Sequence, residues 1–119
     1  MTILSAGVAD AAPAAVNYCN VTAICFFYDG NETGAWWDGG TQSIDDFAGA
    51  TFGQGSLDGA GKRVKNDAAS VYNGSNLPLC VYYDEHFQGR YDVIAPGSAA
   101  NLVQTWNNNA SYQVKHGGC

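Results

Sequence analysis

The chain has 119 residues, a net charge of −6 and only five lysines and arginines together. This length corresponds to one domain, which is large enough for a hydrophobic core and small enough to gain from disulfide bonds. The scarcity of basic residues argues against nucleic acids and anionic membranes as partners, because both are bound through positive charge. With fifteen glycines, seven tyrosines and no long helical pattern, the composition predicts an all-β fold. Only residues 44–50 and 98–106 allow a turn or two of helix.

Residues 1–18 are mostly small and apolar. They resemble the back half of a secretory signal with Ala-x-Ala cleavage sites, although a positively charged amino-terminal region is missing. We expect a disordered remnant of a leader, and hence a secreted, extracellular protein. A disordered linker is the alternative. In either case the folded domain is expected over residues 19–119.

The first predicted hairpin covers residues 24–38 and is followed by the segment Gly39–Gly61, which is rich in Gly, Ser, Thr and Asp. This segment is expected to be an irregular loop or to contain one short helical turn. Three apolar residues are expected to anchor it: Phe47, Phe52 and Leu57. The basic cluster at residues 62–65 is interpreted as a solvated strand edge, with a contact to an acidic partner as the alternative.

A second apolar run, at residues 79–84, alternates with a period of two residues and then turns at an aromatic-x-Gly sequence. The alternation places Leu79 and Val81 on one face of a half-buried strand. Gly89 supplies the backbone angle that a folded hairpin needs and that other residues avoid. Tyr82 is predicted to lie across this glycine.

The hairpin sequence occurs twice, and so does an Asn/Asp-rich segment after it. A shift of 55 positions superposes Phe27 on Tyr82, Asp29 on Asp84 and Gly34 on Gly89. A shift of 41 positions superposes Asn66, Asp67 and Ser70 on Asn107, Asn108 and Ser111. The difference indicates an insertion in the first copy, within residues 39–62. An internal duplication of this kind predicts two Greek keys, at residues 24–72 and 79–116, with about eight strands in a β-sandwich.

Four cysteines without a Cys-x-x-Cys pair indicate two disulfides in an exported protein. Three pairings are possible. Cys19 and Cys25 are close enough to form a small local loop, which leaves Cys80 to pair with Cys119. On the chain-entropy model the longer bridge would contribute ~4 kcal/mol. A zinc site at residues 116–119 is a weaker alternative.

Catalytic motifs are missing from the sequence, which contains no His-Glu-x-x-His, no Gly-x-Ser-x-Gly and no phosphate-binding loop. His86 lies beside Asp84 and Glu85 and has the residue types of a base or a metal ligand. A solvated hairpin tip is the better interpretation. We therefore expect a protein that is not an enzyme.

The paired hairpins at residues 27–34 and 82–89, each followed by an Asn/Asp-rich segment that ends in serine, resemble the microbial βγ-crystallin domain. The Cys-Val-Tyr entry strand and the cysteine layout resemble a narrower group, the small secreted proteins of the Streptomyces metalloproteinase inhibitor family. The resemblance covers residues 19–119 and implies a double Greek-key β-sandwich with two disulfides.

One function that the resemblance implies is inhibition of a secreted, thermolysin-like metalloproteinase by a monomeric protein. The family's reactive bond lies between a disulfide-bonded cysteine and a valine, which corresponds here to Cys80–Val81. Val81 would supply the apolar side chain after the scissile bond, and Pro78 and the disulfide would pre-order the segment. The alternation of the strand makes Val81 a core residue instead, and both interpretations stay open.

A different function implied by the resemblance is calcium binding, in a structural, stress-related or killer-toxin-like antimicrobial protein without inhibitory activity. In the family two ions lie between the repeats, and calcium takes six to eight oxygen ligands. The positions that match the family's ligands are Asn66, Asp67, Ser70, Asn107, Asn108 and Ser111, with carbonyls near Asp29 and Asp84. Val71 and Tyr112 stand where the family has a second serine, so weak or unequal sites are expected. Alternatively, these segments are simply hydrogen-bonded turns.

Overall fold

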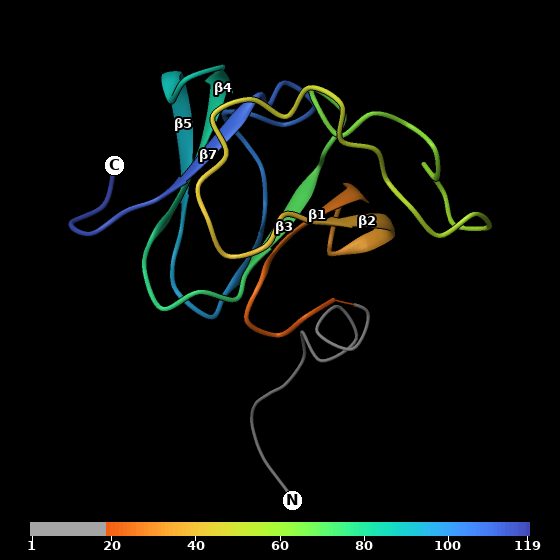
Figure 1. The fold of residues 1–119 in the computed structure, drawn as a ribbon, viewed down its shortest axis with the longest axis horizontal. Coiled ribbons are helices and arrows are strands. Elements are labelled where there is room, and N and C mark those ends of the chain that lie inside the picture. The colour runs from red at the N-terminus through yellow and green to blue at the C-terminus, as the bar shows by residue number, and fades with distance from the viewer. Residues whose placement is uncertain (1–18) are drawn as a thin grey trace, which may run out of the picture.

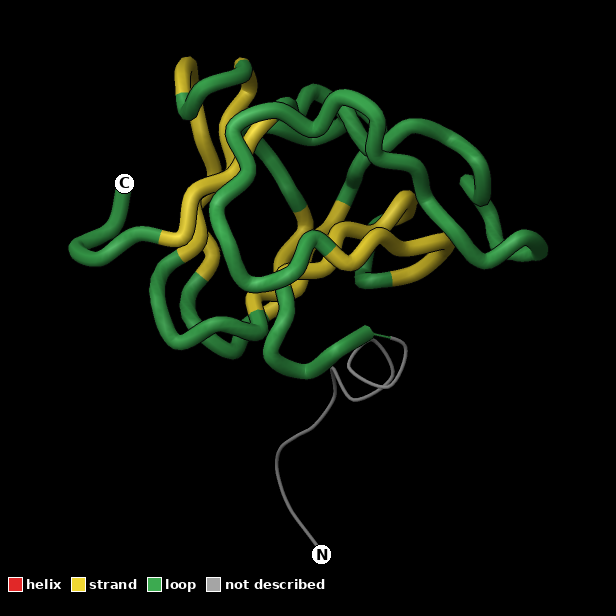
Figure 2. Tube along the Cα trace, in the orientation of Figure 1, coloured by secondary structure: helices red, strands yellow, loops and turns green. Residues whose placement is uncertain are grey.

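The computed structural model describes residues 19–119, and the predicted leader at residues 1–18 lies outside the described residues. The strands are β1 Ile24–Asp29, β2 Thr33–Asp38, β3 Ser70–Asn73, β4 Leu79–Asp84, β5 Gln88–Ile94, β6 Ala99–Asn101 and β7 Ser111–Val114. The described residues form no helix (Figure 2), which confirms the all-β prediction and excludes the helical turns considered at residues 44–50 and 98–106. No helix in this part of the chain meets the length and apolarity needed to cross a membrane.

The strands form two antiparallel sheets that interlock (Figure 1). Sheet A has the order β2-β1-β3-β6, and sheet B has the order β5-β4-β7. Each half of the chain contributes to the sheet of the other half. Strand β6, from the second half, pairs with β3, and Ile44, from the first half, pairs with Tyr112 of β7. Ile44 lies where the duplication predicts the eighth strand, and it forms a single β-bridge there. Because each half pairs with the sheet of the other half, the two Greek keys form one body.

The main core lies between the sheets and is filled by the inward residues of the alternating strands. Phe26 of β1 packs against Phe47 and Tyr112, with ring centres 5.1 and 5.5 Å away. Trp37 joins this cluster through Phe47, at 5.6 Å. Burying a side chain of this size contributes about 1.5–3 kcal/mol relative to exposing it. The phenol of Tyr112 donates a hydrogen bond to the Gly39 carbonyl at 2.8 Å, and burial raises its pKa, so it stays neutral.

The outer face of β1 is covered as well, by a second cluster around the first disulfide. Cys25 and Phe27 point to this face and are almost completely buried. The bond between Cys19 and Cys25 holds the preceding segment over them, while the bond between Cys80 and Cys119 fastens the carboxyl terminus to β4. Both disulfides of the sequence prediction are therefore confirmed.

The inserted loop contributes to the core, although less evenly than expected. Phe47 and Phe52 are buried as predicted, but Leu57 is 41% exposed and is not an anchor. The basic cluster at residues 62–65 is also more than a solvated edge, because Val64 is completely buried. The reason is that Val64 returns the chain into the main core before β3 begins.

Candidate functional site

The two hairpins share an unusual backbone conformation at matched positions. The φ angles are 57°, 54° and 79° at Asn31, Glu32 and Gly34, and 60°, 62° and 82° at His86, Phe87 and Gly89. Positive φ is uncommon outside glycine, so its recurrence 55 residues later supports the duplication at the level of the backbone. In both copies the positive φ favours glycine, and a Cβ there would also lie 2.6–2.7 Å from the carboxylate that precedes the turn, which would have to shift.

Each hairpin is locked by the serine that ends the Asn/Asp-rich segment of the same half. The Ser70 hydroxyl accepts a hydrogen bond from the Glu32 N–H at 2.9 Å and donates one to the Asp29 carbonyl at 2.7 Å. The Ser111 hydroxyl makes the same pair of bonds in the second hairpin, at 3.1 and 2.7 Å. Both serines are completely buried. Their geometry is that of a structural lock, and their implied role as calcium ligands stays a prediction.

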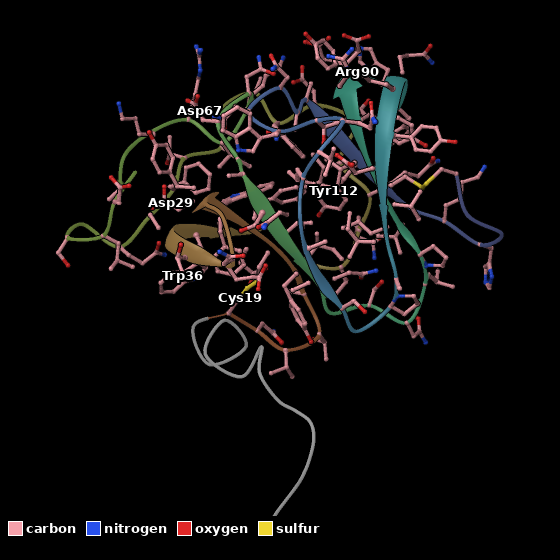
Figure 3. All side chains as sticks on the ribbon, turned by 180° about the vertical axis from the view of Figure 1, so that it is seen from behind. Cys19, Asp29, Trp36, Asp67, Arg90 and Tyr112 are labelled. Atoms are coloured by element: carbon pink, nitrogen blue, oxygen red, sulfur yellow. A yellow bond between two sulfur atoms is a disulfide. The ribbon has the colours of Figure 1, made fainter. Side chains whose placement is uncertain are left out.

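A pocket of about 230 Å³ lies between the first hairpin and both Asn/Asp-rich segments. Its lining comprises Tyr28, Asp29, Gly30, Asp67, Ala69, Trp106 and Asn107. Asp29, Asp67 and Asn107, all nominated from the sequence, meet here (the two aspartates are labelled in Figure 3). The pKa of Asp29 is raised, first by burial and then by a hydrogen bond and charge repulsion from Asp58. A cation bound nearby would favour the charged form of the Asp29 carboxyl.

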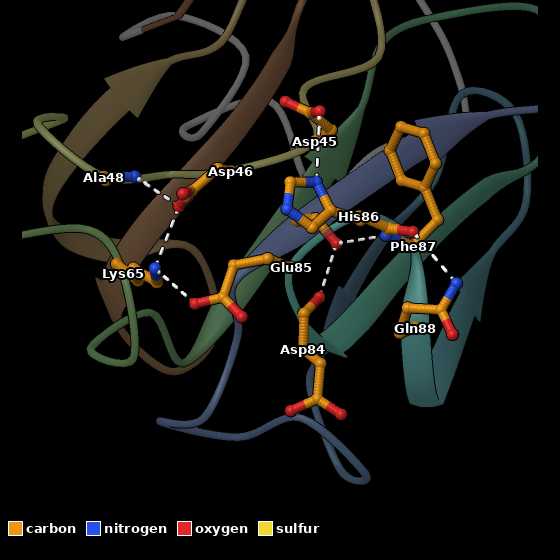
Figure 4. A network of polar contacts seen from close by, with 10 residues as sticks. Asp45, Asp46, Ala48, Lys65, Asp84, Glu85, His86, Phe87 and Gln88 are labelled. Carbon is orange, nitrogen blue, oxygen red and sulfur yellow. Dashed lines mark hydrogen bonds and ion pairs between the residues drawn. The ribbon is translucent and has the colours of Figure 1, made fainter.

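The region beside the second hairpin that corresponds to this pocket contains a lysine from the first half, Lys65. A shift of 41 positions aligns Lys65 with Trp106 of the pocket. The Lys65 ammonium lies 2.9 Å from Asp46 and 2.6 Å from Glu85 (Figure 4). The hydrogen bond from Lys65 is the largest cause that lowers the pKa of each carboxyl. Lys65 thus neutralises the carboxylates of this region at close range, whereas Asp67 of the pocket is paired with Arg63 over a longer distance, 3.7 Å from Nε to the carboxylate.

The two Asn/Asp-rich segments also bind each other. The Asn66 N–H donates to the Asn109 carbonyl at 2.8 Å, and the Asn107 N–H donates to the Ala68 carbonyl at 3.0 Å. The buried amide of Asn109 donates to the carbonyls of Ala68 and Thr105, both at 2.8 Å. These reciprocal bonds fix the relative position of the two halves and the shape of the pocket.

The remaining nominated residues of the second half do not line this pocket. The Asp84 carboxylate lies against Gly89, and the exposed Asn108 donates its side-chain amide to the Trp106 carbonyl at 3.3 Å. His86 is exposed at the hairpin tip, as predicted; its N–H donates to the Asp45 carbonyl at 2.7 Å and its ring lies 3.3 Å from the Asp45 carboxylate (Figure 4).

The bond between Cys80 and Val81 lies in the interior. Both residues have no exposed surface, and β4 is the central strand of sheet B. Val81 stands between Asp92 of β5 and Tyr112 of β7. Val81 is therefore a core residue, which is one of the two alternatives left by the sequence. A peptidase could reach this bond only after β4 had separated from a neighbouring strand, so a reactive bond here stays a prediction that the folded arrangement does not favour.

Known structures identify the fold as that of βγ-crystallin domains. A structure described under the evolution of the eye lens βγ-crystallin domain fold matches with a TM-score of 0.58 and 18% identity, covering 79% of this chain and 85% of that chain. A βγ-crystallin from Ciona intestinalis matches with a TM-score of 0.56 and 16% identity, covering 77% and 98%. A βγ-crystallin domain from Flavobacterium johnsoniae matches with a TM-score of 0.53 and 25% identity, covering 82% and 98%. The predicted fold class is confirmed.

The sequence itself identifies the family. The profile of peptidase inhibitor family I36 matches residues 12–94, which is more than half of the chain, and the chain belongs to this family. No curated protein sequence matches the chain. The suspected resemblance is thereby confirmed for both the fold and the family.

Several exposed apolar residues were not singled out as functional from the sequence. Trp106 borders the pocket and is 57% exposed, and Tyr91 and Val93 of β5 are 43% and 55% exposed. The alternation of residues 91–95 predicts a strand, but it does not indicate that this strand lies at the edge of a sheet.

Proposed function

We propose that this protein is a secreted inhibitor of metalloproteinases of the thermolysin type. The observation that carries the proposal is the match of peptidase inhibitor family I36 over residues 12–94. The two disulfides support an extracellular protein, because such bonds persist in oxidising compartments. The interlocked sheets support inhibition by a rigid body, since a pre-ordered surface loses little conformational entropy on binding.

In this proposal the folded protein blocks the peptidase through its surface and remains uncut. The burial of Cys80 and Val81 supports this mode over a substrate-like bond at that position. Opening β4 would expose the main core and break pairing with both neighbouring strands. The free-energy cost of opening β4 would offset much of the binding free energy gained in the peptidase cleft.

The test is a titration of a thermolysin-type metalloproteinase with the purified, oxidised protein, with serine and cysteine peptidases in parallel. The proposal predicts stoichiometric loss of metalloproteinase activity and little effect on the other two classes. Inhibition confined to a serine or cysteine peptidase would overturn the metalloproteinase assignment. Activity that persists in every peptidase of a broad panel would overturn the inhibitor function.

A second candidate function, calcium binding at the pocket of the first half, is favoured by its donor set. We propose that Asp29 and Asp67 hold a single calcium ion there with oxygens of the neighbouring backbone and of Asn107. Carboxylates and carbonyls are the hard oxygen ligands that calcium prefers. Beside the second hairpin, Lys65 occupies the position where a matching ion would be expected, so one site is proposed and not two.

Thermal unfolding with and without calcium tests this candidate. Calcium at 100 times its dissociation constant would stabilise the protein by about 2.7 kcal/mol. The variant Asp67→Asn should lose most of this stabilisation. The matched control is Asp38→Asn, which retains the oxygen that accepts the Gly40 N–H and lies outside the pocket. Equal calcium responses in all three proteins, or no response in any, would contradict the site.

A further inference from the structure

The edge of β5 carries an inference that rests on the proposed inhibitory function. We propose that the backbone edge of β5 at Tyr91 and Val93 enters the substrate cleft of the target peptidase and pairs there as an added strand. Pairing of this kind uses main-chain hydrogen bonds for affinity and the alternate side chains for specificity. The proposal assigns the inhibitory contact to exposed residues and not to the buried bond of β4.

The internal duplication allows the edge of β5 to be compared with its counterpart, the edge of β2. The inserted loop covers β2: the Ala35 N–H donates to the Asp58 carbonyl at 2.8 Å, and the Gly53 N–H donates to the Trp36 carbonyl at 3.2 Å. The Trp36 N–H also donates to the Gln54 side chain at 2.7 Å. The second half has no such insertion. Among residues 19–119, the same hairpin thus has a covered edge in one copy and an uncovered edge in the other.

The two other sheet edges of the described residues offer less backbone. Strand β7 is covered by residues 43–47, through the paired bonds of Ile44 with Tyr112 and a bond from the Phe47 N–H to the Ala110 carbonyl. Strand β6 has only three residues. Strand β5 has seven and is the longest of the strands in residues 19–119. Natural proteins usually shorten or cover the edge strands of their sheets, so a long edge strand without such protection is a template for pairing with a strand of another chain.

The direction of the backbone groups along β5 follows from the pairing in sheet B. Tyr112 exchanges both of its backbone hydrogen bonds with Ile44, at 2.9 and 3.0 Å. In antiparallel strands the N–H and C=O of one residue point to the same side, and this side alternates along the chain. Tyr112 therefore directs these groups away from β4. Its partner Val81 directs its own groups toward β5, where it pairs with Asp92.

It follows that the residues on either side of Asp92 direct their N–H and C=O groups to the open edge. These residues are Tyr91 and Val93, and their side chains share the outer face of sheet B. Both side chains are among the large apolar groups that remain exposed, at 43% and 55%. Free backbone groups and apolar side chains thus coincide at the same two positions.

The edge is held rigid by its neighbours. The Asp92 carboxylate accepts hydrogen bonds from the N–H groups of residues 103–105 and from the Thr105 hydroxyl, at 2.7–3.2 Å. Arg90 donates from Nε to the Gln104 carbonyl at 3.0 Å, and its guanidinium lies 4.3 Å from the centre of the Tyr83 ring. These contacts fix the strand (Arg90 is labelled in Figure 3), so docking requires little further ordering.

A peptidase cleft suits this edge better than a second copy of the chain. Peptidases bind their substrates as extended backbone, which is the conformation that β5 already has. The net charge of −6 opposes the approach of two identical copies. The family match names a peptidase as the class of partner.

The first test changes one backbone donor at the edge. Val93→Pro removes the outward N–H, and proline is tolerated on edge strands where that N–H faces solvent. The matched control, Val93→Ala, shortens the side chain and keeps the N–H. The proposal predicts that the inhibition constant rises at least 100-fold in Val93→Pro and less than tenfold in Val93→Ala, with both variants folded by circular dichroism. Unchanged inhibition by a folded Val93→Pro would overturn the docking site while leaving the inhibitory function intact.

A second test uses the wild-type chain and does not depend on the folding of a variant. Amide hydrogen exchange is measured by NMR for the free protein and for its complex with the inhibited metalloproteinase. The expected result is fast exchange of the Tyr91 and Val93 amides in the free protein and slow exchange in the complex. Protection of these amides in the free protein, together with a dimeric mass, would indicate pairing of two copies and overturn the proposal. Protection confined to another surface would also overturn it.

Discussion

The serine locks provide the sharpest prediction, because two explanations of the same residues predict different results. In Ser111→Ala, one N–H and one carbonyl of the second hairpin lose their partner at 3.1 and 2.7 Å. Each hydrogen bond contributes about 1 kcal/mol net, and a buried unsatisfied group costs about 1–3 kcal/mol. Since water can reach the half-exposed turn, we expect a loss of about 2 kcal/mol. For a domain of this size such a loss lowers Tm by ~10 °C.

The assay is urea unfolding of Ser70→Ala, Ser111→Ala and the control Ser56→Ala, each in calcium and in a chelator. Ser56 is exposed, so its replacement should change stability by less than about 0.5 kcal/mol. The hairpin-lock explanation predicts similar losses for Ser70→Ala and Ser111→Ala, and the same losses in calcium and in the chelator. Variants that are as stable as the wild type in the chelator, and that lack only the stabilisation by calcium, would refute it and establish the serines as ligands.

Three further predictions concern the core, the inserted loop and the response to pH. Val81→Asp should unfold the protein and not merely abolish inhibition, because an unpaired carboxylate would enter the main core; circular dichroism of a native-like variant would contradict this. In thermal unfolding, Gly59→Ala should destabilise the protein by more than Gly61→Ala. Both glycines have positive φ, but only at Gly59 would a Cβ collide with Tyr28. Equal losses of stability in the two variants would contradict this packing. Lys65→Met should reduce stability at pH 7 and less so below about pH 4. The reason is that Lys65 lowers the pKa of Asp46 and of Glu85, so the stability that these carboxylates contribute is lost as the pH falls through their lowered pKa values. A difference in denaturant midpoint between variant and wild type that is independent of pH would contradict this prediction.

The features that the sequence predicts well are local in the chain. The hairpin turns depend on a few adjacent residues, and Gly34 and Gly89 mark them because glycine adopts their positive φ without strain. The short separation of Cys19 and Cys25 identified one disulfide, and with four cysteines the other followed by elimination. The duplication then extended these local signals to the whole fold.

The features that it predicts poorly depend on contacts between distant segments. Lys65 belongs to a basic cluster in the sequence, but its partners lie 19 and 20 positions away on either side, and only the folded chain brings them together. Val81 fits both a core residue and a reactive bond until β4 is known to be the central strand. The open edge of β5 depends on the pairing of three strands, which no pattern within β5 itself reveals.

The most direct test is mass spectrometry of the protein after it has inhibited a metalloproteinase. The peptidase is mixed with an equimolar amount of the oxidised protein and is incubated with substrate over many turnovers. If the folded surface is the inhibitor, peptidase activity stays low and the chain stays intact between Cys80 and Val81. Inhibition accompanied by a single cleavage at this bond would show that β4 opens in the peptidase, and would contradict inhibition by an uncut, folded body.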